Sequence, residues 1–153
     1  MLKSNQTNLI PVLLIVLFVI LGCGGGQNSS STSNSTTGPA VSSITWADYD
    51  KIYGVKSKTT DMQKEQSWKD FQGKRVAWSG EVAEVSNGTF GGLQVSIKMD
   101  KDTLISDINL ELKKDYEGAA SKLTKGSRLN FVGTMKSYGG AILPATLSDG
   151  ELK

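Results

Sequence analysis

The chain has 153 residues, of which 17 are basic and 15 acidic, and its formal net charge is +2. A nucleic-acid-binding domain normally shows a basic patch or a high pI, so this near-neutral balance argues against that class. The absence of histidine removes the commonest general base and metal ligand, and a single cysteine excludes an intrachain disulfide and a thiolate zinc cage. We expect a protein that is not an enzyme and that holds no metal or cofactor.

Residues 1–22 have the pattern of a signal peptide. One positive charge, Lys3, precedes the run LIPVLLIVLFVIL from Leu9 to Leu21, which is apolar throughout. That length suits the core of a signal peptide and is short for a membrane-spanning helix, which needs roughly 20 residues. The alternative is an uncleaved membrane anchor whose N-terminus stays inside the cell.

The residues that follow the apolar run favour the signal peptide. Ile20–Leu21–Gly22–Cys23 resembles the lipobox of bacterial lipoproteins, in which a small residue precedes an invariant cysteine. The resemblance implies that Cys23 receives a diacylglycerol and that cleavage falls between Gly22 and Cys23, after which the new amino group is acylated. Two or more acyl chains anchor stably, because each buried CH₂ contributes about 0.8 kcal/mol. We expect a lipid-anchored protein of the bacterial cell envelope.

The residue after the cysteine bears on which membrane holds the protein. In many Gram-negative lipoproteins an Asp at this position retains the protein in the inner membrane, and here the position holds Gly24. The resemblance therefore implies an outer-membrane protein that faces the periplasm, if the organism is Gram-negative.

Residues 23–43 read CGGGQNSSSTSNSTTGPAVSS and form the expected lipidated cysteine and linker. The tract has no charged residue and no apolar periodicity. Such a composition cannot bury enough surface to offset the entropy of the chain, so we expect a disordered tether. The folded domain is then residues 44–153.

Two helices are predicted at the start of this domain. Thr45 and Asp48 form a capping-box pattern, and aromatic residues follow at helical spacing up to a stop at Gly54. A second helix is expected over residues 60–71, with Met62, Trp68 and Phe71 on its buried side. We expect the aromatic residues of both helices to pack against one end of a barrel rather than to stack on a ligand.

Strands are predicted for the rest of the chain. The segment RVAWSGEVAEVS alternates and then slips in phase after a glycine, which indicates a bulge and a bend. Asn87–Gly88 predicts a turn. Three further alternating stretches predict strands, a short helix is expected over residues 118–123, and the last strand is expected over residues 141–147, where Pro144 indicates an edge or a bulge.

The order of three strands, a short helix and two strands is the layout of the OB-fold, a five-stranded Greek-key barrel. We therefore predict a mainly β protein with short N-terminal helices and a helix between strands three and four. The segments FQGKRVAWSGEVAEV and LTKGSRLNFVGTM resemble strands one and four of the bacterial tRNA-anticodon-like OB-fold family and of related OB-fold lipoproteins. This resemblance covers roughly residues 60–147 and implies the fold.

OB-folds bind ligands on the outer face of strands two and three, between the first and last hairpin loops. Mapped onto this chain, that face and its loops give the candidate binding residues Phe90, Gln94, Lys98, Asn109, Lys136 and Tyr138. The alternative is an ordinary solvated sheet face, because scattered polar side chains on a surface need no special explanation. Asp100, Asp102 and Asp107 are too few for a calcium loop, and we interpret them as parts of a turn.

The sequence thus predicts a membrane-anchored envelope lipoprotein with a non-catalytic OB-like binding module. We expect its partner to be an envelope protein, a glycan or a small envelope ligand. A structural docking subunit of an envelope complex is the first alternative. A nucleic-acid-binding domain is the second, and both the charge balance and the expected location argue against it.

Overall fold

The computed structural model describes residues 39–88, 91–140 and 142–153. The predicted signal peptide, Cys23 and most of the expected linker lie outside the described residues, as does the candidate binding residue Phe90.

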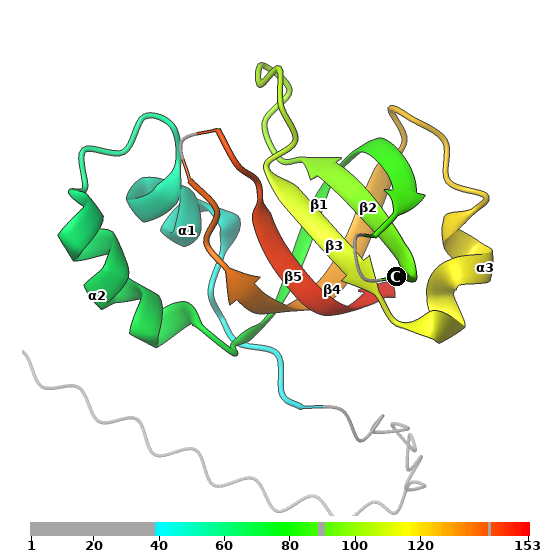
Figure 1. The fold of residues 1–153 in the computed structure, drawn as a ribbon, viewed down its shortest axis with the longest axis horizontal. Coiled ribbons are helices and arrows are strands. Elements are labelled where there is room, and N and C mark those ends of the chain that lie inside the picture. Colours follow the sequence, from blue (N-terminus) through cyan, green and yellow to red (C-terminus); the bar gives the residue numbers. More distant parts are fainter. Residues whose placement is uncertain (1–38, 89–90, 141) are drawn as a thin grey trace, which may run out of the picture. The chain divides into compact units, whose positions relative to one another are not determined.

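The described part is built around a closed five-stranded β-barrel (Figure 1). Its strand order is β1-β2-β3-β5-β4, and every neighbouring pair is antiparallel except β3 and β5. This arrangement confirms the predicted OB-like barrel. The strands are β1 (Arg75–Asn87), β2 (Leu93–Lys98), β3 (Ile108–Leu112), β4 (Arg128–Ser137) and β5 (Ala145–Leu152).

Alternating side chains fill the barrel interior. Because successive residues of a strand point to opposite faces, every second residue reaches the core. The fully buried members come from all five strands, which explains why the alternation was readable in the sequence. The largest of them are Val76, Val82, Val95, Ile97, Ile108, Leu110, Phe131, Met135 and Leu147.

The first strand bends where its sequence predicted a bulge. Its pairing with β2 slips in register between Val82 and Glu84. Gly80 sits just before the slip, and a Cβ atom at this position would lie 2.4 Å from the Ile97 side chain and 2.7 Å from the Lys98 carbonyl oxygen. The glycine is therefore needed for the close approach of β1 and β2.

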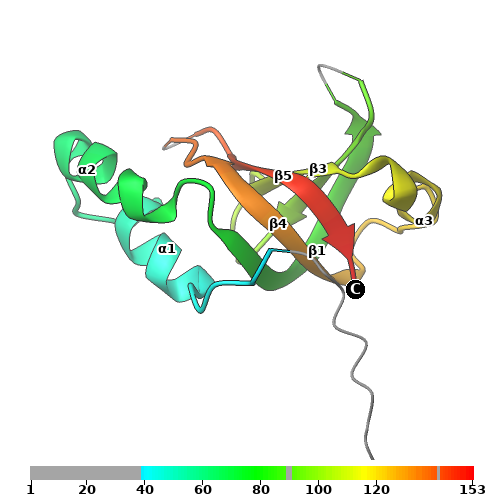
Figure 2. The ribbon, with the colours of Figure 1, turned by 90° about the horizontal axis from the view of Figure 1, so that it is seen from below.

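Two helices precede the barrel, α1 (Trp46–Tyr53) and α2 (Asp61–Phe71). They lie together on one side of it, and the short helix α3 (Glu117–Ala120) lies on the other side (Figures 1 and 2). Thr45 caps α1 through the predicted box with Asp48, and Gly54 ends the helix. On α2, Phe71 is buried and Trp68 is half-buried, but Met62 is 72% exposed, so its predicted burial was wrong.

An aromatic cluster joins these helices to the barrel. Its rings lie 4.8 to 6.3 Å apart, in both stacked and edge-to-face pairs. The Tyr49 hydroxyl donates to the Tyr138 carbonyl at 2.6 Å, and the Trp78 indole N–H donates to the Ile44 carbonyl at 2.9 Å. This packing confirms that the aromatic residues are part of the core. The cluster comprises Trp46, Tyr49, Tyr53, Trp68, Phe71, Trp78 and Tyr138.

Two elements span other residues than the sequence predicted. The helix between β3 and β4 was expected over residues 118–123 but is a 3₁₀ turn, Lys114–Tyr116, followed by α3 (Glu117–Ala120). Only Ala120 of these residues is buried, so there was little apolar pattern to locate it. The last strand was expected over residues 141–147 but runs from Ala145 to Leu152, with Pro144 just before it.

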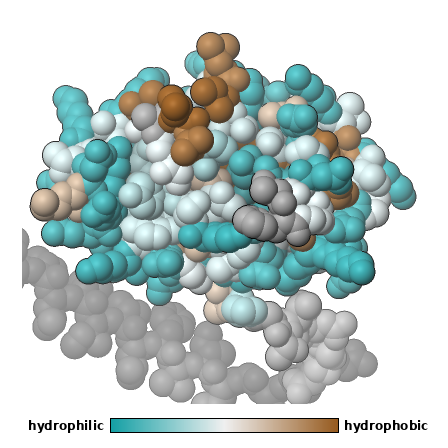
Figure 3. Space-filling model, viewed as in Figure 1, coloured by the Kyte–Doolittle hydropathy of each residue, from teal (hydrophilic) through white to brown (hydrophobic). Residues whose placement is uncertain are grey.

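Most of the surface in Figure 3 is hydrophilic, and apolar side chains gather at the top of that view. Across the described ranges, no helix combines the length and the apolarity needed to span a bilayer.

A candidate ligand-binding cavity on the outer face of the barrel

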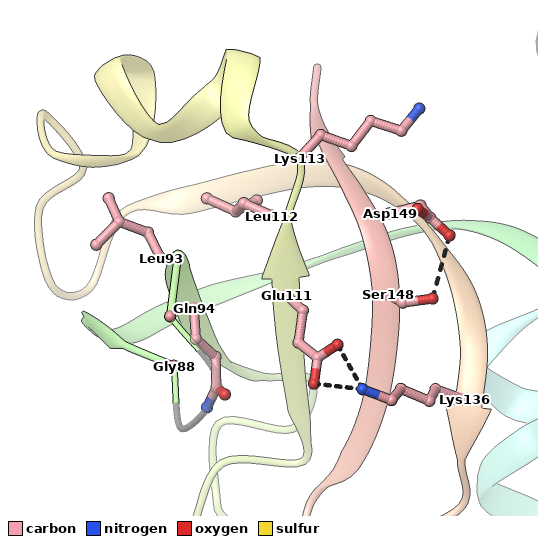
Figure 4. Close-up of a pocket in the computed structure, with 10 residues that line it drawn as sticks. Gly88, Leu93, Gln94, Glu111, Leu112, Lys113, Lys136, Ser148 and Asp149 are labelled. Atoms are coloured by element: carbon pink, nitrogen blue, oxygen red, sulfur yellow. Dashed lines mark hydrogen bonds and ion pairs between the residues drawn. The ribbon is translucent and has the colours of Figure 1, made fainter.

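A cavity of about 270 Å³ opens on the outer face of the barrel, where β2, β3 and β5 run side by side (Figure 4). The turn after β1 and the end of β4 complete its wall. It lies on the face that OB-folds use for ligands, next to the first hairpin loop. Its lining residues are Gly88, Gly91, Leu93, Gln94, Glu111, Leu112, Lys113, Lys136, Ser148 and Asp149.

An ion pair crosses the cavity. The Lys136 ammonium group on β4 reaches over β5 and donates to both carboxylate oxygens of Glu111 on β3, at 2.8 and 2.9 Å. Both side chains are partly exposed, 49% for Lys136 and 34% for Glu111. Exposed pairs of this kind contribute only about 0–1 kcal/mol, so a ligand could replace either partner at small cost.

The wall formed by β5 depends on an unusual backbone conformation. Asp149 has a φ of 53°, in the left-handed region, which Asp tolerates better than most residues. Next to it, Gly150 packs so tightly on Leu110 that a Cβ atom would lie 2.7 Å away. The pairing of β3 with β5 slips at this point, between Leu110 and Leu112. The distortion leaves Ser148 and Asp149 on the cavity wall, with a hydrogen bond of 3.2 Å between their side chains.

A cationic cluster borders the cavity on the side of Lys113. Glu151 accepts from Lys113 at 2.5 Å, from Lys153 at 3.0 Å and from Arg75 at 2.5 Å. These hydrogen bonds, that of Lys113 foremost, lower the pKa of the Glu151 carboxyl to about 2. Three cations thus share one carboxylate beside the cavity.

Polar and apolar groups share the cavity wall. The side chains of Leu93 and Leu112 supply apolar surface, while Gln94 and Ser148 can both donate and accept hydrogen bonds. The charged groups have both signs. This lining suits a small polar ligand that carries both donors and acceptors along with some apolar surface.

The structure brings together two of the predicted site residues, Gln94 and Lys136, both of which line the cavity. Lys98 on β2 and Asn109 on β3 lie outside the lining, and the Asn109 side chain accepts a hydrogen bond from Ser96 at 3.0 Å. Tyr138 packs in the aromatic cluster against Tyr53 and Trp68 instead of lining the cavity.

Sequence reasoning did not single out Ser148 and Asp149. The reason is the displaced last strand, because residues beyond Leu147 were not expected to pair with β3. The parallel pairing of β3 and β5 in an OB-fold was the signal that could have found them. It places the residues after Leu147 beside residues 111–113.

No group of three or more acidic, cysteine or histidine side chains in a metal-binding arrangement occurs within residues 39–88, 91–140 and 142–153. Asp107 instead stabilises the turn after β2, where its carboxylate accepts from the backbone N–H of Met99 at 2.7 Å.

Comparison with known proteins gives structural likenesses only. No family model matches the chain, and no curated protein matches it. Among solved structures, it is similar to a "putative nucleic acid-binding lipoprotein" from Klebsiella pneumoniae, with 18% identity and a TM-score of 0.43 over 57% of this chain and 76% of that one.

It is also similar to two OBody proteins, each bound to hen egg-white lysozyme. OBody AM3L09 has 13% identity and a TM-score of 0.40, over 54% of this chain and 84% of that one. OBody AM3L15 has 14% identity and a TM-score of 0.39, over 54% and 79%. At these identities and scores, the likenesses say nothing about what this chain binds.

Proposed function

We propose that this chain is a bacterial envelope lipoprotein, held to a membrane by lipid on Cys23, whose OB-like barrel is a non-catalytic binding module. The cavity on the face of β2, β3 and β5 carries the binding part of the proposal. The lipobox Ile20–Cys23 carries the anchoring part.

The ligand that fits best is a short stretch of envelope glycan. The cavity volume of about 270 Å³ lies just below the range of typical small-molecule sites, roughly 300–1,000 Å³, so it suits one or two sugar units. Hydroxyl and amide groups of a glycan match the mixed donors and acceptors of Gln94, Glu111 and Lys136. The apolar faces of sugar rings match Leu93 and Leu112.

A nucleic acid is the disfavoured ligand. Single strands need a basic groove and several aromatic side chains on which bases stack. The cavity lining carries two lysines and two acidic residues, and none of its residues is aromatic. The tryptophan rings of this chain all belong to the aromatic cluster in the core.

The binding proposal is tested on the purified full-length chain with a peptidoglycan fragment, the disaccharide of N-acetylglucosamine and N-acetylmuramic acid with its stem peptide. We expect the fragment to raise the unfolding temperature of the protein. Lys136→Ala should weaken binding about tenfold, the loss expected when one charge-assisted hydrogen bond to the ligand is removed. Calorimetric titration measures the change.

The matched control is Lys98→Ala, which removes a lysine from the same barrel face but outside the cavity lining. Its affinity should equal that of the unchanged protein. If the fragment shifts nothing, and crosslinking in cells recovers one stable protein partner, the barrel is a docking subunit and the glycan proposal fails.

A further inference from the structure

Four large aliphatic side chains project from two neighbouring loops of the barrel. Leu104 is 96% exposed and Ile105 52%, both between β2 and β3, while Ile142 is 75% exposed and Leu143 66%, both between β4 and β5. We call these four residues the aliphatic tip. Apolar side chains gather at the top of the view in Figure 3, where the β2–β3 and β4–β5 loops lie in the same view of Figure 1.

Barrel topology holds the two loops side by side. The strands that follow them, β3 and β5, are parallel and start in register, with Ile108 opposite Ala145. A hydrogen bond of 2.9 Å from the Ala145 N–H to the Asp107 carbonyl ties the ends of the loops together. Both aliphatic pairs lie within four residues of these strand starts, so they emerge at the same end of the barrel.

We infer that the aliphatic tip inserts into the interface of the bilayer that carries the lipid anchor, as a second membrane contact of the same chain. This inference rests on the anchoring part of the proposed function. Exposed aliphatic side chains lose contact with water when they enter the boundary between headgroups and acyl chains, and a weak insertion of this kind needs a second anchor to hold.

The size and composition of the tip favour a lipid surface over a protein partner. Its side chains together expose about as much as three complete aliphatic residues, whereas a stable protein interface uses roughly 20–30 residues on each side. Binding hot spots are enriched in Trp, Tyr and Arg, and the tip has none of these.

Charge favours a zwitterionic bilayer in particular. The β4–β5 loop, residues 138–144, contains no charged residue. The β2–β3 loop, residues 99–107, has three aspartates and one lysine, so the two loops themselves supply no basic cluster that would attract anionic lipids. Insertion should therefore depend on the aliphatic side chains and change little with salt.

Chain length permits both contacts at once. Residues 24–38 separate Cys23 from the described domain and have a maximal span of about 50 Å. A domain of this size is about 35 Å across. The tip can therefore reach the bilayer that holds Cys23, and tethering raises its effective concentration at that surface.

The test places a nitroxide label at the tip of the full-length lipidated chain, in vesicles of phosphatidylethanolamine and phosphatidylcholine. Leu104→Cys provides the labelling site, because the Cys23 sulfur is blocked by its lipid. The matched control is Val55→Cys, whose side chain is 76% exposed and lies just after α1. We expect a label at residue 104 to be several-fold less accessible to a water-soluble nickel chelate than a label at residue 55.

If both loops insert together, a change on one loop should alter the exposure of the other, and this gives a second measurement. With a label on Leu143→Cys, the added substitution Leu104→Asp should raise the accessibility of the label to the chelate, because a charge on one loop withdraws both. Leu104 is almost fully exposed, so its substitution should leave the unfolding temperature unchanged.

Each of the other possible outcomes contradicts either the anchoring proposal or the inference of insertion. Absence of the acyl mass on Cys23 overturns the anchoring proposal. Presence of that mass with equal accessibility at residues 104 and 55 overturns insertion alone. If the label at residue 104 is protected from the chelate without vesicles, and more so at higher protein concentration, the tip contacts a second copy of the chain. If the protection requires added envelope protein, the tip contacts a protein partner. Either result overturns insertion.

Discussion

Glu151 makes the densest set of ionic contacts in the described part of the chain. Its side chain is 15% exposed and accepts from three cations: Arg75 on β1, Lys113 just after β3, and Lys153. Arg75 is itself only 8% exposed, so Glu151 is the group that balances a nearly buried guanidinium. Removing the carboxylate would leave the nearly buried Arg75 guanidinium without its partner, and an uncompensated charge of this kind destabilises the folded state.

The lowered pKa of Glu151 predicts a pH-dependent stability. The carboxyl has a pKa of about 2 in the folded chain, below its ordinary value of 4.5, so the folded state binds the proton less readily. Its stabilisation is complete above pH 4.5 and is lost as the pH falls from 4.5 toward 2. Glu151→Gln should lower the free energy of unfolding by about 1–3 kcal/mol at neutral pH, and this deficit should shrink across that window. Denaturant unfolding at several pH values measures it.

Glu84→Gln is the control for this prediction. Glu84 is exposed on the same barrel, and the structure shows no ion pair for it within the described residues. Its stability curve should run parallel to that of the unchanged protein. A constant deficit for Glu151→Gln from pH 7 to pH 2 would contradict the assigned role of Glu151.

Individual residues show where a sequence pattern is ambiguous. Met62 fits the apolar stripe of α2 but lies in its first turn, before the helix reaches the barrel, so it stays in solvent. Tyr138 was predicted to face a ligand because it lies in a hairpin loop. Its burial depends on α1 and α2, which are far away in sequence, and no local pattern could reveal that contact.

Among the elements, β1 shows how much of the fold is predictable. Its alternation, its phase slip and its central glycine all appeared in the sequence, and the structure has the bulge at the predicted place. Alternation is readable because one side of the strand is fully buried. The last strand was displaced because Ser148–Asp149–Gly150 is a typical turn sequence, whereas here it continues β5 through a left-handed residue.

The close approach of β1 and β2 at Gly80 gives a testable prediction. Gly80→Ala puts a methyl group against the Ile97 side chain and the Lys98 backbone, so β1 and β2 must separate. We expect the free energy of unfolding to fall by about 1–3 kcal/mol. Gly118→Ala in α3 is the control, because no atom lies within 4 Å of its would-be Cβ and alanine favours a helix. It should be neutral or slightly stabilising, and an equal loss for both variants would contradict the close-approach argument.

At the scale of the whole molecule, the expected membrane anchor and the candidate cavity differ in how far the sequence can predict them. The predicted anchoring depends on four consecutive residues, Ile20–Cys23, whose resemblance to a lipobox does not depend on the fold, and it stays a prediction. The cavity brings together residues 88 to 149, and its walls form only after strands distant in sequence have paired. The barrel could therefore be predicted from local alternation, but the set of lining residues could not.

For the whole molecule, we predict that lipid on Cys23 anchors the chain to a membrane. Cys23→Ser removes the sulfur nucleophile, so the chain should incorporate no labelled palmitate and accumulate as a precursor that still carries residues 1–22. Metabolic labelling and gel mobility measure both effects. Ser29→Cys in the same background is the control for position, because it restores a thiol outside the lipobox and should restore neither labelling nor processing. Normal labelling of the Cys23→Ser chain would disprove the lipobox prediction.

The place of β5 between β3 and β4 has a consequence for the order of folding. Among the described strands, β5 comes last in the sequence and closes the barrel, since it pairs with β3 on one side and β4 on the other. During synthesis, which runs from the N-terminus, the closing strand therefore emerges after the other four. Until residues 145–152 arrive, the edges of β3 and β4 stay unpaired and open to mispairing with other chains. Closure of the barrel, together with the part of the cavity wall that β5 forms, is therefore a late step of folding.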